Sequence, residues 1–506
     1  MAGEHRRLTG PSAIATLRND HVFAMITGPG GCAMSNTDAR SDDTPHSAEP
    51  ALHRVMGPWL LLLFIIGDIL GTGIYALTGK VANLVGGAVW LPFLMAFGVA
   101  LLTAFSYLEL VTKYPRAAGA ALYTHRAFGI HFVTFLVAFA VMASGITSAS
   151  TASRAFAANL SDAFGLGLAG GIGITVIGLL FMGLVAAVNL RGVGESVKLN
   201  VLLTVVELTG LLIIIVIGLW AIAGGQGDVS RVLEFKAPEG SSWLWASIAA
   251  TTLAFFAMVG FEDSVNMAEE TENPTRTFPK ILLLGLAITG TIYVLVSISA
   301  ITLVPAAELG EGETPLLKVV AAGAPNFPLS VFGFITMFAV ANSALINMLM
   351  ASRLVYGMSR EHVLPPVLGK VHPTRRTPYV AIAFTTLLAC LLVTFVGEVP
   401  ALGGTTALLL ICVFTVVNAA VLILRRDPVD HEHFRTPTAL PVLGAVCCAF
   451  LSGPWTGRDP VQYKVAGMLL LVGIALWFVT VWINRRSGVH PTDPRPEDVG
   501  GGGAHN

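Results

Sequence analysis

The sequence predicts an all-α integral membrane protein with about twelve transmembrane helices, because of its composition and of a repeated apolar unit. Of its 506 residues, 54% are hydrophobic and only 12% are charged, and the mean hydropathy is +0.73. A surface that faces water requires a larger share of charged residues than this. The repeated unit is an apolar stretch of roughly 20 residues, which as a helix spans the ~30 Å hydrocarbon layer of a bilayer.

The apolar stretches follow one another from residue 58 almost to the C-terminus. The expected spans are 58–83, 87–112, 130–160, 169–190, 196–223, 243–268, 279–303, 328–356, 379–397, 403–424, 438–454 and 464–484. Proline disfavours helical geometry in the residue before it, so Asn273-Pro274 and Phe278-Pro279 predict a short, rigid connector before the seventh span.

The polar ends of the chain are expected to lie outside the membrane. Residues 1–50 are rich in Ser, Thr, Asp, Pro and His and lack the apolar core of a secretory signal, which predicts a disordered cytoplasmic extension. The chain then divides into a ten-helix core over 51–424, two further helices over 425–485, and a disordered cytoplasmic tail over 486–506.

The basic residues predict the orientation of the helices. They concentrate in alternate loops, at 113–126, 191–198, 276–280, 360–376, 425–435 and 485–486. By the positive-inside rule these loops face the cytoplasm, which puts both termini inside and agrees with an even number of helices. We therefore expect a multi-pass protein of the cell (inner) membrane.

Several function classes find no support in the sequence. A net charge of -1 supplies no concentrated basic face for a nucleic acid. The five cysteines have no metal or disulfide spacing, and no HExxH or GxSxG motif is present, so neither an enzyme nor a cofactor is expected. A channel filter usually needs a ring of oxygens around a pore, which a single chain of this kind does not predict.

Two segments interrupt the helical pattern at membrane depth: residues 67–75, GDILGTGIY, and residues 255–264, FFAMVGFEDS. Single glycines in membrane helices often serve only to let neighbouring helices approach. These two segments, however, lie five helices apart, as expected if spans 1–5 and 6–10 form an inverted repeat whose halves each open on a discontinuous helix. Unwound backbone offers N–H groups to a carboxylate and carbonyl groups to an ammonium.

These segments and their flanks resemble the amino acid-polyamine-organocation superfamily of permeases over nearly the whole chain beyond the N-terminal extension. The resemblance rests on GTGIYALTG at 71–79, SYLELVTKYPRAAGAALY at 106–123, GFEDSVNMAEETENPTRTFPK at 260–280, and SRLVYGMSREHVLPPVLGKVHPTRRTPYVAI at 352–382. It implies a twelve-helix fold whose last two helices lie outside the repeat and sometimes form a homodimer.

The resemblance also implies the residues of a substrate site. The carboxylate of an amino acid would meet the backbone around Gly71, Thr72 and Gly73. Its amino group would meet carbonyl groups near Ile69, Phe256, Ala257 and Val259. This assignment agrees with the roles that unwound backbone can play.

Glu207 lies mid-span in the fifth helix, where similar permeases commonly carry a lysine that occupies the place of a sodium ion and exchanges protons. The sequence departs from that pattern. An ionisable group within the apolar layer persists mainly where it has a partner or a task. Three roles stay open for Glu207: a proton carrier, a neutral acid hydrogen-bonded within the bundle, or a ligand of Na⁺.

Three more acids flank the interrupted segments. Asp68, just before the first break, is compatible with attracting a cationic substrate, with proton movement, or with tying down the unwound backbone. Of the neighbours Glu262 and Asp263, one is expected to face the pathway, because adjacent helical residues point about 100° apart. The extra acid is compatible with cationic amino acids or polyamines and does not establish them.

Together these observations predict a secondary amino-acid transporter that works by alternating access and imports its substrate with protons. A transporter or exchanger of polyamines or cationic amino acids is the alternative, and a non-transporting amino-acid sensor is a second one. The expected partners are a small amino acid, H⁺ or Na⁺, and the bilayer. The backbone site reads only the groups common to all amino acids, so the side chain of the substrate stays undetermined.

Overall fold

The computed structural model describes residues 56–115, 119–168, 171–191, 193–237, 240–268 and 270–487. The predicted N-terminal extension and all but the first two residues of the predicted C-terminal tail lie outside these ranges. The described chain is helical, and its β-structure is limited to two isolated bridges, Met56 with Thr271 and Gly86 with Phe235.

The α-helices follow the predicted spans closely. They are α1 Pro58–Ile69, α2 Thr72–Val85, α3 Trp90–Lys113, α4 Gly119–Phe128, α5 His131–Ala163, α6 Ile172–Arg191, α7 Val193–Ala223, α8 Trp243–Ala254, α9 Pro274–Leu303, α10 Ala306–Leu309, α11 Pro315–Gly323, α12 Leu329–Arg360, α13 Tyr379–Phe395, α14 Val399–Leu424, α15 Ala439–Leu451 and α16 Pro460–Ser487. Short 3₁₀ helices are η1 Gly87–Val89, η2 Val229–Leu233, η3 Phe255–Met258, η4 Asp263–Met267, η5 Pro366–Gly369 and η6 Pro454–Thr456.

Ten helical stretches within the described residues are long and apolar enough to cross a membrane. The ninth and eleventh expected spans are also helical, but α13 and α15 fall short of that length. One boundary differs clearly from the prediction. The helix α9 begins at Pro274 and contains Pro279, because Pro274 occupies the first turn, where its missing N–H costs nothing, and the helix continues through the second proline.

The first and sixth stretches are each broken in the middle. α1 ends at Ile69 and α2 begins at Thr72, so Leu70 and Gly71 separate two helices of one span. In the sixth stretch α8 passes into the 3₁₀ turn η3, after which Val259 is extended, with φ -80° and ψ 148°. Gly260 follows with φ +125°, a conformation that residues with a Cβ rarely adopt.

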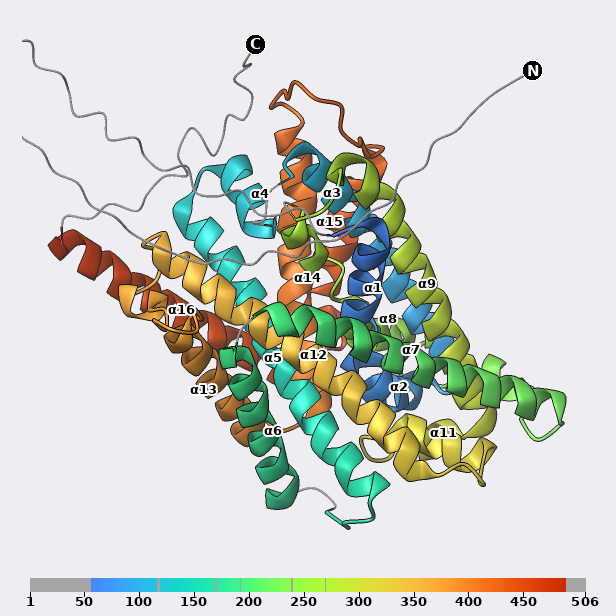
Figure 1. Ribbon diagram of the computed structural model, residues 1–506. Coiled ribbons are helices and arrows are strands. Elements are labelled where there is room, and N and C mark those ends of the chain that lie inside the picture. Colours follow the sequence, from blue (N-terminus) through green and yellow to red (C-terminus); the bar gives the residue numbers. More distant parts are fainter. Residues whose placement is uncertain are drawn as a thin grey trace, which may run out of the picture. The chain divides into compact units, whose positions relative to one another are not determined.

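The helices pack into two groups, which Figure 1 shows together with α7, α14 and the last helices. In the first group α3 packs against α8 and α9, α1 against α9, and α2 against α8. In the second group α5 packs against α6, α12 and α13, and α12 also packs against α13. α7 contacts α1, α9 and α12, whereas α14 contacts α3, α5 and α8.

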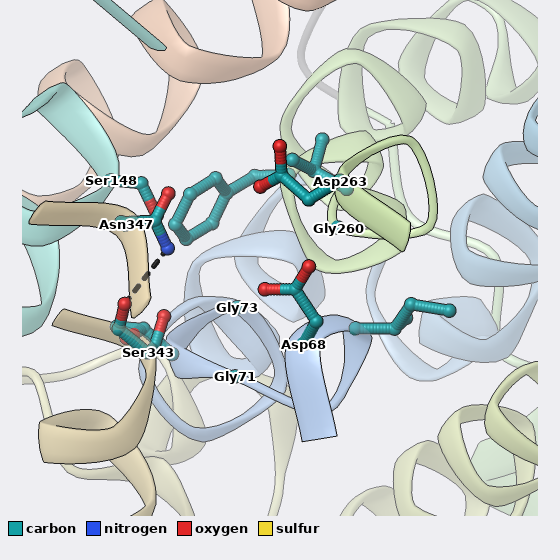
Figure 2. A pocket seen from close by; sticks show the side chains of 12 residues that line it. Asp68, Gly71, Gly73, Ser148, Gly260, Asp263, Ser343 and Asn347 are labelled. Carbon is teal, nitrogen blue, oxygen red and sulfur yellow. Dashed lines mark hydrogen bonds between the residues drawn. The ribbon is translucent and has the colours of Figure 1, made fainter. Parts of the chain in front are cut away.

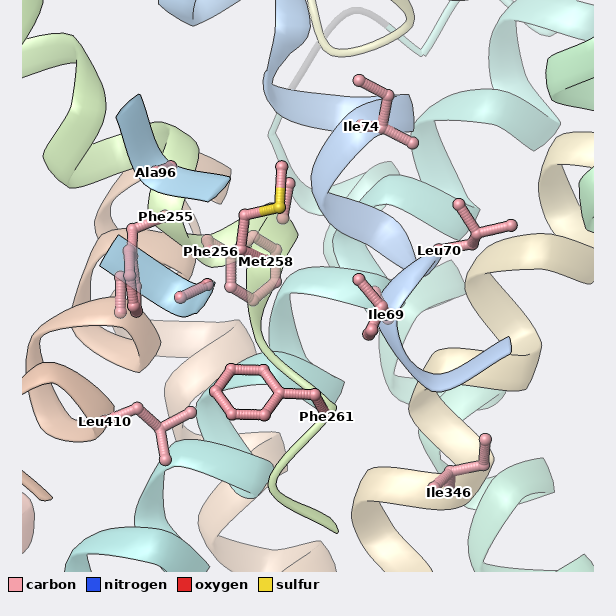
Figure 3. Packing of buried hydrophobic residues seen from close by; sticks show 14 of the residues in the cluster. Ile69, Leu70, Ile74, Ala96, Phe255, Phe256, Met258, Phe261, Ile346 and Leu410 are labelled. Atoms are coloured by element: carbon pink, nitrogen blue, oxygen red, sulfur yellow. The ribbon is translucent and has the colours of Figure 1, made fainter. Parts of the chain in front are cut away.

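Apolar side chains surround the two breaks and hold them in place (Figure 3). Ile69 and Leu70 on one side and Phe255 and Phe256 on the other are all buried. Phe261, immediately after the second break, packs its ring against Phe414 of α14 with a centroid separation of 5.4 Å. Buried apolar side chains therefore flank the polar backbone at both breaks.

The N-terminal end of α1 is tied to the connector that follows η4. The Met56 N–H donates to the carbonyl oxygen of Glu270 at 2.9 Å, and the Glu272 N–H donates to the carbonyl oxygen of Met56 at 3.1 Å. These backbone hydrogen bonds join the two interrupted spans at one end of the bundle.

Candidate substrate-binding site

The two breaks lie directly against each other. A Cβ placed on Gly73 would be 2.5 Å from the Cα of Ala257, and a Cβ placed on Gly260 would be 2.7 Å from the carbonyl carbon and oxygen of Asp68. Only a glycine fits at either position, since a Cβ cannot approach backbone so closely. The glycines thus bring unwound backbone from both spans into contact.

A small polar cavity lies where the breaks meet. Its lining residues are Asp68, Ile69, Gly71, Thr72, Gly73, Ser148, Phe256, Val259, Gly260, Asp263, Ser343 and Asn347. The cavity offers about 20 Å³ to the centres of water molecules, which is roughly the space of one or two waters. An amino acid can enter only if the lining moves apart.

Two carboxylates face this cavity. In Figure 2 those of Asp68, on α1, and Asp263, at the start of η4, both point toward the space beside Ser148 and Asn347. Asp68 is buried, and its Oδ2 has no hydrogen-bond partner among the described residues. Two carboxyl groups beside one cavity, one of them with an unpartnered oxygen, suit an ammonium group.

Glu262, the neighbour of Asp263, turns away from the cavity. Its Oε2 accepts a hydrogen bond from the backbone N–H of Gly260 at 2.9 Å, and the side chain is buried. The two adjacent acids therefore sit in different environments. Glu262 fixes the turn at the second break, while Asp263 lines the cavity.

The backbone at the first break presents polar groups of both kinds. The first N–H groups of α2, which starts at Thr72, have no partner within the helix and form the positive end of its dipole. The carbonyl oxygen of Ile69 accepts a hydrogen bond of 2.5 Å from the Tyr293 hydroxyl. That bond anchors the end of α1 to α9 and fixes the direction of the Ile69 carbonyl group.

The opposite wall is made of polar side chains that the sequence prediction missed. Ser148 comes from α5, and Ser343 and Asn347 come from α12. The Asn347 Nδ2 donates to the carbonyl oxygen of Ser343 at 2.8 Å, drawn as a dashed line in Figure 2. A polar pair four residues apart shares one helix face, and in an apolar span that spacing is a signal that could have identified them.

Glu207 lies behind the first break and does not line the cavity. It is fully buried. Neither of its carboxylate oxygens makes a hydrogen bond of good geometry in the described part of the chain, but the Asn342 side chain lies close enough to interact with the carboxylate as a hydrogen-bond donor. Asn342 itself accepts a hydrogen bond from Asn200 at 3.2 Å. The hydroxyl of Tyr75 donates to the carbonyl oxygen of Glu207 at 2.8 Å, which links this buried acid to α2.

α7 approaches α1 closely beside Asp68. A Cβ on Gly67 would be 1.9 Å from the Oγ1 of Thr204, one turn of α7 from Glu207. The structure thus brings most of the predicted site together, with Ala257 packed on Gly73 just outside the lining, and with Glu207 and Glu262 adjacent to the cavity and not in it. No cluster of His, Cys, Asp or Glu suited to a metal ion occurs among the described residues.

Comparison with known proteins identifies relatives of this chain. The model of a family described as amino acid permease matches residues 56–483. The chain is 26% identical over 451 residues to the branched-chain amino acid permease BcaP of Bacillus subtilis, an alignment that covers 86% of this chain and 94% of that protein.

Two further relatives carry other substrates in their names. A methylthioribose transporter of Bacillus subtilis is 26% identical over 86% of this chain and 94% of its own length. The chloroplastic cationic amino acid transporter 9 of Arabidopsis thaliana is 28% identical over 64% of this chain and 58% of its own length. The family match extends over most of the chain, so the protein belongs to the amino acid permeases of the amino acid-polyamine-organocation superfamily.

Proposed function

We propose that this protein is a secondary transporter that carries an amino acid across the cell membrane by alternating access. The observation that supports the proposal most directly is the meeting of two interrupted helices around a polar cavity. The N–H groups at the start of α2 suit a carboxylate, and the carbonyl groups of Ile69, Phe256 and Val259 with the Asp68 carboxylate suit an ammonium. Both ends of a zwitterion find partners in one place.

The proposal includes twelve membrane helices with an inverted repeat of five and five, and both termini in the cytoplasm. The packing pairs support the repeat. In the proposed repeat α7 corresponds to α14, α5 to α12, α1 to α8, and α3 to α9. The contact of α7 with α12 then has its counterpart in the contact of α14 with α5, and the contact of α1 with α9 has its counterpart in the contact of α8 with α3. α13 and α15 then count as the ninth and eleventh spans, and the last two helices stand outside the repeat.

Alternating access assigns different motions to the two helix groups. The group of α1, α2, α3, α8 and α9 rocks against the group of α5, α6, α12 and α13, with the cavity between Asp68 on the first and Ser343 on the second. A cavity with space for roughly one or two waters corresponds to a closed state. Rocking in either direction opens it to one side of the membrane.

Proton coupling is the part of the mechanism that we assign to Glu207. A fully buried carboxylate is costly when charged, and α7, which carries Glu207, contacts α1 through Thr204 and α2 through the bond from Tyr75. Protonation would remove the negative charge of Glu207, a residue that does not line the cavity and so does not need to touch the substrate. Movement of α1 would then depend on the protonation of Glu207.

A second substrate class, cationic amino acids or polyamines, is favoured by one observation, the presence of both Asp68 and Asp263 in the cavity lining. A zwitterion supplies one ammonium group, whereas lysine or a diamine supplies two. Polyamines lack a carboxylate, so the start of α2 would lose its partner. Among these ligands a cationic amino acid uses both the acids and the backbone N–H groups.

The test is uptake of labelled amino acids, with putrescine included, into proteoliposomes under an imposed pH gradient. Wild type is compared with Glu207→Gln and with Glu432→Gln, a matched change at an exposed loop residue. We expect gradient-driven accumulation in wild type and in Glu432→Gln. Glu207→Gln should lose accumulation but retain exchange of labelled for unlabelled substrate.

Two outcomes would contradict these assignments. If Glu207→Gln still accumulates substrate in response to the gradient, Glu207 is not the coupling group, and a Na⁺ gradient becomes the next condition to test. If no substrate moves in wild type while unlabelled amino acid still raises the melting temperature of the protein, the carrier proposal fails and a sensor is the better account.

A further inference from the structure

A second cavity lies at the end of the bundle where α2 ends, away from the helix breaks. It is lined by Gly86 and Gly87, by Arg231, Glu234, Phe235 and Lys236 of the linker between α7 and α8, and by Ile301, Pro305 and Ala306 at the end of α9 and just beyond it. It offers about 280 Å³ to the centres of water molecules, compared with about 20 Å³ at the breaks. The transport mechanism gives this larger cavity no role.

The wall of the cavity is held by backbone contacts. The Gly87 N–H donates to the Glu234 carbonyl oxygen at 2.8 Å, and the Lys236 N–H donates to the Val85 carbonyl oxygen at 3.0 Å. A Cβ on Gly87 would lie 1.6 Å from the Arg231 carbonyl oxygen, so the linker can pack here only on a glycine. The backbone of the linker that carries the charged side chains is therefore held in a fixed position.

The charges in and beside the cavity balance. Arg231 and Lys236 are cations and Glu234 is an acid. The Nε of Arg231 lies 3.5 Å from the Oδ2 of Asp228. The hydrogen bond from Ser230, together with the charge of Arg231, lowers the pKa of Asp228 below its ordinary value of 3.8, at which an Asp carboxyl is already ionised at neutral pH. A neutral site with both signs suits a ligand that carries both signs.

The surroundings of the cavity are apolar and lie at the level of a membrane interface. Trp220, near the end of α7, and Trp243, at the start of α8, are 77% and 53% exposed, and tryptophans at the ends of spans mark the headgroup level. The Phe235 ring meets the Trp243 ring edge-on at 5.5 Å. Leu233, between charged linker residues, is 71% exposed, as expected for a side chain that contacts lipid.

We propose that this cavity binds the headgroup of a zwitterionic phospholipid with a primary ammonium, phosphatidylethanolamine. Its phosphate lies against Lys236 and Arg231, its ammonium donates to Glu234, and its acyl chains run along Leu233 and Phe235. An anionic lipid without an ammonium leaves Glu234 unpaired next to its negative charge. A choline headgroup carries no N–H to donate, and a free amino acid leaves the apolar rim uncovered.

Native mass spectrometry of the detergent-solubilised full-length protein tests the proposal, with phosphatidylethanolamine, phosphatidylglycerol and phosphatidylcholine of matched chains added one at a time. The variants are Lys236→Gln and Glu234→Gln. Lys464→Gln, at an exposed lysine near the start of α16 at the same end of the bundle, is the control. Loss of one charged contact is expected to weaken binding about tenfold, which corresponds to about 1.4 kcal/mol.

We expect wild type and Lys464→Gln to retain one phosphatidylethanolamine in preference to the other lipids, and both cavity variants to lose that preference. Equal retention of phosphatidylglycerol, with no effect of Glu234→Gln, would overturn the assignment of the ammonium to Glu234. Undiminished phosphatidylethanolamine binding in both variants would overturn the site itself. If a free amino acid stabilises wild type but not these two variants, the cavity binds the transported substrate and not a lipid.

Discussion

Arg425 donates two hydrogen bonds to the carboxylate of Glu109, from Nε to Oε1 at 2.8 Å and from Nη2 to Oε2 at 2.7 Å. Glu109, on α3, is 2% exposed and also accepts a hydrogen bond from the Thr436 N–H at 2.9 Å. The bond to Glu109 raises the pKa of Arg425, against the effect of burial. This pair fastens the linker after α14 to the end of α3.

Removal of one partner of this ion pair should destabilise the protein. We expect Glu109→Ala to lower the free energy of unfolding by about 1–3 kcal/mol, because it leaves the Thr436 N–H unpaired and removes two charged hydrogen bonds from Arg425, which keeps those to Thr438 and to the Thr436 carbonyl group. Glu432→Gln, in the same linker, is the control. Denaturant unfolding in mixed micelles measures the change, and a double-mutant cycle with Arg425→Gln isolates the coupling; additive losses would show that the pair is not coupled.

Gly260→Ala should abolish substrate binding. The new Cβ meets the Asp68 carbonyl group at 2.7 Å, and the φ of +125° at this residue adds strain of about 1–3 kcal/mol. We expect the breaks to separate and the amino-acid-induced rise in melting temperature to disappear. Gly183→Ala, on an open face of α6, should retain that rise. A Gly260→Ala protein that binds substrate normally would refute the role given to the contact.

Asp263→Asn tests whether the second carboxylate selects cationic substrates. Asp263 lines the cavity, where its carboxylate would pair with the second ammonium group of lysine. Its neutralisation should therefore raise the KM for lysine about tenfold and leave leucine uptake nearly unchanged. Glu262→Gln removes the same charge one residue away but keeps an oxygen for the Gly260 N–H, and should change neither KM. Equal effects of the two variants on lysine uptake would mean that Asp263 acts only through the general field of the site.

Glu313, in the linker between α10 and α11, should make stability depend on pH. Burial raises the pKa of its carboxyl, an effect that nearby Arg154 and Lys80 oppose and Asp162 and Glu398 reinforce. The native state then binds more protons than the unfolded state at pH values above the ordinary pKa of 4.5. The contribution of Glu313 to stability is therefore full below that pH and is lost as pH rises through the raised native pKa.

In Glu313→Gln the loss of stability with rising pH is expected to be smaller, because the amide does not titrate. Melting temperatures of wild type and variant, recorded from pH 4 upward, should diverge as the pH rises, with the variant more stable at neutral pH. Glu311→Gln, an exposed neighbour in the same linker, should follow wild type. Parallel curves for wild type and Glu313→Gln would show that the carboxyl titrates alike in both states.

The sequence predicted the helices well because each apolar stretch is long enough to be recognised by length alone. It also identified both breaks, because the segments around Gly71 and Gly260 each combine glycine with an acid and lie five helices apart, as expected for an inverted repeat. The start of α9 was placed five residues too late, because Pro279 lies inside the helix, whereas a proline in a helical pattern usually indicates a helix boundary.

Less of the candidate site could be predicted. Ser343 and Asn347 belong to a span that carries no glycine break, and their position beside Gly71 depends on the packing of α12 on α5 and α7. The sequence analysis expected one of the neighbours Glu262 and Asp263 to face the pathway, but which of them does so depends on the bond between Glu262 and the Gly260 N–H. The position of Ser343 and Asn347 is decided by long-range packing, and the direction of Glu262 by this local bond.

The pair of backbone hydrogen bonds between Met56 and the connector after η4 limits how the molecule can open. If α1 swung outward alone, both bonds would break, at a net cost of roughly 1–3 kcal/mol. If α1 and the connector travel together, neither is lost. The two interrupted spans then move as one rigid unit, so that a displacement of either span changes both halves of the binding site at the same time.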